Sequence, residues 1–122
     1  MNTTTILFAA GIAFLLIFLS GFCLSRKGRP LNRGLSTAHK LISLAAGIYL
    51  LFTIYQRNKV VALGVQEWIA IAVTGLCFLG TVASGGLLSA DKPAPAALLR
   101  VHQIVPVLTL LASGLTLYLL LG

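Results

Sequence analysis

Residues 29–55, RPLNRGLSTAHKLISLAAGIYLLFTIY, decide the fold that the sequence predicts. The stretch opens with a basic turn marked by Pro30 and continues as a long apolar run. His39 lies about two helical turns inside that run. An apolar segment of this length predicts a membrane-spanning helix that carries a histidine near one end.

The same arrangement returns 63 residues later in the chain. Lys92-Pro93 precedes His102 by the interval that separates Arg29-Pro30 from His39, and a second apolar run follows. The spacing therefore predicts an internal repeat of two hairpins, each with a histidine at a corresponding place.

The composition predicts that the main partner of the chain is the lipid bilayer. Of its 122 residues, 58% are hydrophobic and 9% are charged, whereas soluble domains carry about 25% charged residues. The net charge of +7 does not indicate nucleic-acid binding, because the basic residues flank apolar runs, where they set membrane topology.

Four apolar runs predict helices over about 6–24, 35–55, 65–88 and 96–121. We expect an all-α membrane protein, an up-down four-helix bundle that forms one integral membrane domain over 1–122. The two hairpins would share one topology and be related by a pseudo-twofold axis along the membrane normal.

The distribution of basic residues predicts the orientation. Two flank one side, Arg57 and Lys59. Seven flank the other side: Arg26, Lys27, Arg29, Arg33, Lys40, Lys92 and Arg100. Because Lys and Arg accumulate in cytoplasmic loops, we expect a multi-pass protein of the cell (inner) membrane with both termini outside.

His39 and His102 are the candidate metal ligands, since intramembrane histidines are functional candidates. Both lie in helices that begin on the same side, on the second and fourth helices, which are diagonal in an up-down bundle. Two such imidazoles can ligate one flat macrocycle such as haem.

The remaining candidate cofactor-binding residues fall into two groups. Small or weakly polar residues share a helix face with a histidine and leave room for a cofactor, although they equally allow close helix packing: Ser43, Gly47, Thr109 and Ser113. Basic residues near the histidines can pair with haem propionates, although topology or headgroup contact explains them as well: Arg33, Lys40 and Arg100.

Paired histidines on the second and fourth helices of a membrane bundle resemble small b-type cytochromes, such as cytochrome b561-type proteins. Ser36-Thr37-Ala38-His39-Lys40 is similar to the Ser-x-x-His-Arg pattern of haem-bearing anchor subunits in respiratory complexes, with Lys in place of Arg. The resemblance implies haem b and one-electron exchange with quinol or a redox protein. Cytochrome b561 proteins use four histidines for two haems, so the two histidines here allow one bis-histidine haem.

Three alternatives stay open on the sequence. The chain also suits a non-catalytic structural or assembly subunit of a larger membrane complex, or a homodimer. A small transporter would need an intramembrane carboxylate, and Glu67 and Asp91 lie at helix ends. A Ser-His-Asp triad cannot be assembled without a buried acid, which leaves an enzymatic activity undecided.

Overall fold

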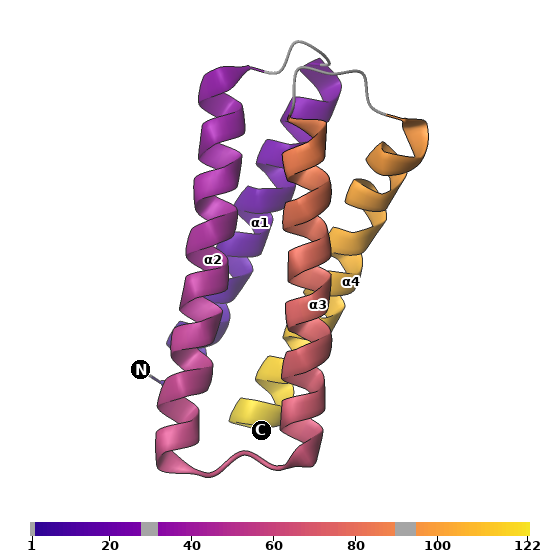
Figure 1. The fold of residues 1–122 in the computed structure, drawn as a ribbon. Coiled ribbons are helices and arrows are strands. Elements are labelled where there is room, and N and C mark those ends of the chain that lie inside the picture. Colours follow the sequence, from indigo (N-terminus) through magenta and orange to yellow (C-terminus); the bar gives the residue numbers. More distant parts are fainter. Residues whose placement is uncertain (1, 28–31, 90–94) are drawn as a thin grey trace. The chain divides into compact units, whose positions relative to one another are not determined.

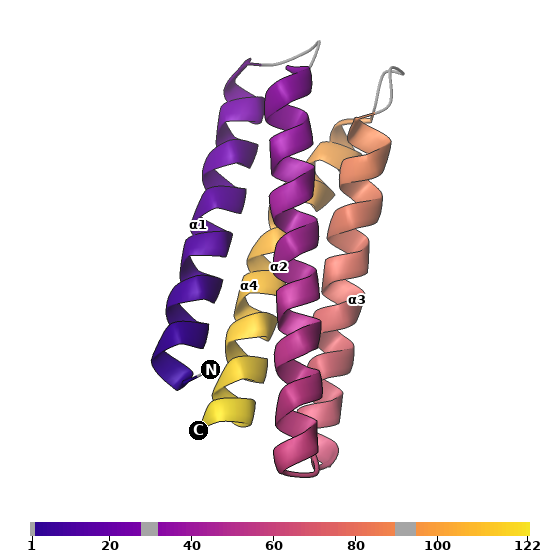
Figure 2. The ribbon, with the colours of Figure 1, turned by 90° about the vertical axis from the view of Figure 1, so that its left-hand side faces the viewer.

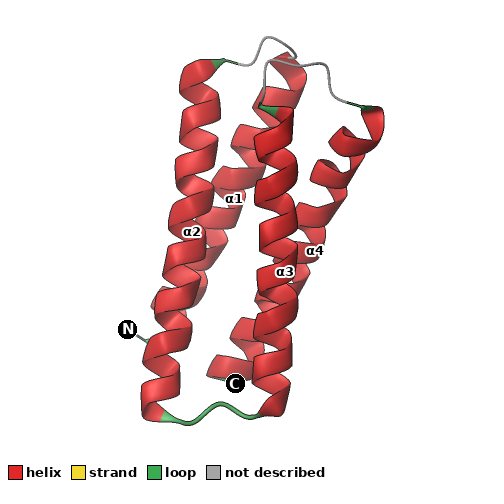
Figure 3. Ribbon diagram, viewed as in Figure 1, coloured by secondary structure: helices red, strands yellow, loops and turns green. Residues whose placement is uncertain are grey.

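The computed structural model describes residues 2–27, 32–89 and 95–122, and these residues form four long helices (Figures 1 and 3). The helices are α1 (Thr3–Lys27), α2 (Arg33–Val60), α3 (Val65–Leu88) and α4 (Ala96–Leu121). No strand occurs in the described part of the chain, so the predicted all-α class is confirmed. The proline-marked turns at Arg29-Pro30 and Lys92-Pro93 lie outside the described residues.

The bounds of α3 and α4 agree with the predicted ranges, whereas α1 and α2 are longer than predicted. Both longer helices begin at an asparagine cap: Asn2 Oδ1 accepts a hydrogen bond from the Thr5 amide at 2.8 Å, and Asn32 Oδ1 accepts one from the Leu35 amide at 2.9 Å. Such a side chain satisfies one of the amides that a helix leaves without an intrahelical partner. The helices therefore begin at the caps, before the apolar runs.

Polar residues also prolong these two helices at their C-terminal ends. The last turn of α1 holds Arg26, which lies 5.8 Å from the Phe22 ring centroid, and the last turn of α2 holds Lys59, 4.6 Å from the Tyr55 ring centroid. Positive charge is favourable at a helix C-terminus. Each cation also packs on an aromatic ring, which explains why helical structure continues past the apolar residues.

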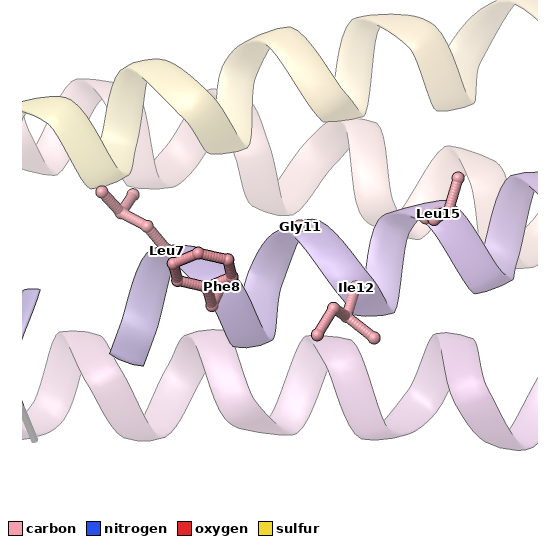
Figure 4. A pocket seen from close by; sticks show the side chains of 5 residues that line it. All are labelled: Leu7, Phe8, Gly11, Ile12 and Leu15. Carbon is pink, nitrogen blue, oxygen red and sulfur yellow. The ribbon is translucent and has the colours of Figure 1, made fainter. Parts of the chain in front are cut away.

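All four helices are long and apolar enough to cross a membrane, so the chain is a multi-pass membrane protein. The shortest, α3, has 24 residues, which is about 36 Å of helix against about 30 Å of hydrocarbon. Large apolar side chains are exposed along the helices. Figure 4 shows one such surface, an apolar recess whose lining comes entirely from α1: Leu7, Phe8, Gly11, Ile12 and Leu15.

The chain divides into two compact units, residues 1–60 and 61–122, and each unit is a helical hairpin. In the first hairpin α1 packs antiparallel against α2, and in the second α3 packs antiparallel against α4 (Figures 1 and 2). The up-down order predicted within each hairpin is therefore confirmed. The single domain and the pseudo-twofold axis stay predictions.

Hydroxyl groups join the helices of the second hairpin. Thr74 Oγ1 lies 2.8 Å from Thr116 Oγ1, and Thr81 Oγ1 lies 3.1 Å from Thr109 Oγ1. Thr116 is fully buried. Between membrane helices, where lipid is as apolar as a leucine side chain, such hydrogen bonds and small side chains hold the pair together.

Candidate functional site

In the first hairpin, His39 of α2 contacts a serine and a glycine of α1. Its Nδ1 atom lies 2.8 Å from Ser20 Oγ. A Cβ atom added to Gly21 would lie 3.1 Å from the Cε1 atom of the ring. The imidazole is half-buried, and it packs against the α1 backbone because the next residue after Ser20 has no side chain.

In the second hairpin, His102 of α4 makes the same two contacts with α3. Its Nδ1 atom lies 2.9 Å from Ser84 Oγ, and a Cβ atom added to Gly85 would lie 2.8 Å from its Cε1 atom. Ser84 is buried, and His102 also has a hydrogen bond with the backbone of Thr81. The two histidines thus occupy corresponding positions in two separately packed hairpins.

The serine–glycine pairs form a repeat that the sequence analysis missed. Residues 20–25 read SGFCLS and residues 84–89 read SGGLLS, so a Ser-Gly-x-x-Leu-Ser pattern precedes each histidine. Its two copies are 64 residues apart, and the histidines are 63 residues apart. This pattern is the signal that identifies the partners of both rings.

Each of these serines also donates a hydrogen bond to its own helix. Ser20 Oγ lies 3.0 Å from the Ile17 carbonyl oxygen, and Ser84 Oγ lies 3.0 Å from the Thr81 carbonyl oxygen. Both acceptors are three residues before the serine. The hydroxyl is therefore held between a backbone carbonyl and an imidazole nitrogen in both hairpins.

The small polar residues predicted to line a cofactor lie at helix contacts or beside the histidine backbone. Ser43 Oγ donates to the carbonyl oxygen of His39 at 2.7 Å. Thr109 Oγ1 pairs with Thr81 across the second hairpin, and Ser113 is buried at 2% exposure. Gly47 is half-buried in α2. These positions fit close helix packing, and their role toward a cofactor stays a prediction.

The predicted propionate partners are exposed side chains on the same helices as the histidines. Arg33 and Lys40 lie on α2, at the start of the helix and directly after His39, and Arg100 lies two residues before His102 on α4. Their exposure keeps the cationic groups accessible to an anionic group at the membrane surface.

The donor set suits a haem better than a closed metal site. Within residues 2–27, 32–89 and 95–122, no group of three or more His, Cys, Asp or Glu side chains is placed to hold a metal ion. A structural zinc site needs four such ligands. A six-coordinate haem needs two axial imidazoles, each oriented by a contact at its other ring nitrogen. Ser20 and Ser84 supply such a contact.

No protein family, curated protein or solved structure matches the chain. Function is therefore argued from the geometry of the two histidine sites.

Proposed function

We propose that this membrane protein is a b-type cytochrome in which His39 and His102 are the axial ligands of one haem b. The observation that carries the proposal is the repeated contact: each hairpin holds a histidine by Nδ1 on a serine, at 2.8 Å in one and 2.9 Å in the other. Axial histidines are held in this way, through the nitrogen that does not bind the metal.

The choice of histidine at these two places supports coordination. The second hairpin already joins its helices with Thr74–Thr116 and Thr81–Thr109, so hydroxyl pairs are sufficient to fasten membrane helices in this chain. An imidazole at the corresponding place in each hairpin adds a property that threonine lacks, an aromatic nitrogen able to bind iron.

When bound, the haem supplies one-electron transfer, so quinol or a redox protein is the expected partner. The protein contributes the two oriented imidazoles and the exposed cations Arg33, Lys40 and Arg100. Charge-assisted hydrogen bonds from these cations to carboxylates are stronger than neutral ones. We place the site near the cytoplasmic leaflet of the cell membrane, with both chain termini outside, on the strength of the seven-to-two bias in flanking basic residues.

A structural or assembly subunit is the second candidate function. The observation that favours it is that the Ser–His contacts join the helices of each hairpin as the threonine pairs do. Interhelical hydrogen bonds of this kind stabilise membrane proteins without any cofactor.

Absorption spectra of the protein expressed with ample haem separate the two functions. The cytochrome proposal expects a low-spin, six-coordinate spectrum that His39→Ala and His102→Ala each abolish, since each removes one axial ligand. Arg57→Ala, in the last turn of α2, serves as the matched control and should keep the spectrum. A colourless wild-type protein would support the structural function instead.

A further inference from the structure

We infer that Ser20 and Ser84 are positioning residues that keep the proton of each histidine on Nδ1, which makes Nε2 the ligating nitrogen of both rings. The inference deepens the proposed function, on which its relevance to haem rests. The protonation pattern itself follows from hydrogen bonds within each hairpin and is measurable without haem.

The argument begins with the single proton of a serine hydroxyl. Ser84 Oγ is 3.0 Å from the carbonyl oxygen of Thr81 and 2.9 Å from Nδ1 of His102. A carbonyl oxygen can only accept, so the serine proton is used in the bond to Thr81. The oxygen of Ser84 then offers His102 only its lone pairs, and Nδ1 must carry the hydrogen that completes the second bond.

The first hairpin repeats this arrangement with different residues. Ser20 Oγ is 3.0 Å from the carbonyl oxygen of Ile17 and 2.8 Å from Nδ1 of His39. The same count of donors and acceptors places a hydrogen on Nδ1 of His39. Two independent hairpins therefore specify the same tautomer by the same device.

The consequence concerns the other nitrogen of the ring. A neutral imidazole has one N–H group and one nitrogen with a lone pair, so a proton on Nδ1 leaves the lone pair on Nε2. The hydrogen bond at Nδ1 also sets the direction of the ring, as an outer partner does for a metal-bound histidine. Both rings would then ligate iron as neutral imidazoles through equivalent atoms.

The glycines contribute the space that this geometry requires. A methyl group at Gly21 or Gly85 would lie 3.1 Å or 2.8 Å from the Cε1 atom of the histidine that the preceding serine holds. The ring reaches its serine only where the next residue has no side chain. The Ser-Gly pair is thus one functional unit, found once in each hairpin.

Nitrogen-15 NMR of the whole chain in detergent, with labelled histidine and no haem, tests the tautomer directly. We expect protonated Nδ1 and unprotonated Nε2 in both neutral rings, assigned with His39→Ala and His102→Ala. An Nε2-protonated tautomer at either ring would overturn the inference for that hairpin.

Serine variants test whether the hydroxyl is the cause. Ser20→Ala should convert His39 to a mixture of tautomers and leave His102 unchanged, and Ser84→Ala should do the reverse. The unaltered histidine reports in each variant that the other hairpin is still folded. Ser84→Thr should restore the wild-type spectrum, because threonine keeps the hydroxyl.

Ser89→Ala is the matched control. Ser89 Oγ donates to the carbonyl oxygen of Gly86, also three residues earlier, at 2.9 Å. Its removal should alter neither ring. Unchanged tautomers in Ser20→Ala and Ser84→Ala would contradict a positioning role for the two serines.

A haem titration of the same variants separates this inference from the proposed function. If the wild-type chain binds haem, each serine-to-alanine variant should bind it about 10- to 100-fold more weakly, the usual effect of removing an outer partner. Wild-type protein that shows Nδ1 protonation and binds no haem would refute the cytochrome function and support the tautomer. Equal affinity of wild type and serine variants would overturn the positioning role while the cytochrome function stands.

Discussion

The imidazole of His102 lies so close to Gly85 that an added Cβ atom would be 2.8 Å from its Cε1 atom. Real side chains essentially never approach so closely, so any residue other than glycine must displace the ring or separate α3 from α4. The neighbouring Gly86 has no such constraint, since nothing lies within 4 Å of its added Cβ.

Gly85→Ala is therefore expected to destabilise the second hairpin, whereas Gly86→Ala is not. Overpacking costs about 1–3 kcal/mol in soluble cores, while alanine favours a helix over glycine by about 1 kcal/mol. Thermal unfolding of the detergent-solubilised variants measures the difference. Equal stability of the two variants would mean that His102 does not pack on Gly85.

Gly21→Ala should show a smaller effect of the same kind. Its added Cβ would lie 3.1 Å from Cε1 of His39, so a shift of a few tenths of an ångström relieves the contact. We expect a loss of unfolding free energy toward the lower end of the range of about 1–3 kcal/mol. Gly11→Ala, at an open position on the same helix, is the control, and a larger loss there than at Gly21 would contradict the assignment.

The buried Thr74–Thr116 pair should contribute measurably to the second hairpin. Their hydroxyl oxygens are 2.8 Å apart, and a double-mutant cycle with Thr74→Val and Thr116→Val isolates the interaction. We expect a coupling free energy of about 0.6 kcal/mol, and at most about 1.7 kcal/mol, as found for hydrogen bonds between membrane helices. Additive losses in the two single variants would show that the hydroxyls do not interact.

Both chain termini are expected to react with a membrane-impermeant thiol reagent added to intact cells. After replacement of Cys23 and Cys77 by alanine, Thr3→Cys and Gly122→Cys should be labelled, because the basic residues concentrate at the other ends of the helices. Ser25→Cys and Ser89→Cys should be protected until the membrane is permeabilised. Protection of Thr3→Cys and Gly122→Cys with labelling of the other two would reverse the orientation.

The sequence predicted the helices better than their beginnings and ends. Hydropathy located α3 and α4 because their apolar runs coincide with the helices, and it shortened α1 and α2 because Asn2 and Asn32 cap them before the apolar residues begin. Capping is a local side-chain property that an average over an apolar run does not detect.

Within the candidate site, the sequence predicted the histidines and missed what holds them. The matched proline-to-histidine spacing singled out His39 and His102. Pairing with Ser20 and Ser84 depends on the register of each antiparallel hairpin, which apolar periodicity does not set on helices that are apolar around most of their surface. The repeated Ser-Gly-x-x-Leu-Ser pattern was the available signal for these partners.

The ratio of haem to protein, measured together with the spin state of the oxidised iron, tests the central claim most directly. One bis-histidine site formed by His39 and His102 predicts one low-spin haem for each purified chain, with low-spin iron lost in both His39→Ala and His102→Ala. A colourless chain, or a haem whose low-spin signal persists in either variant, would contradict ligation by these two histidines.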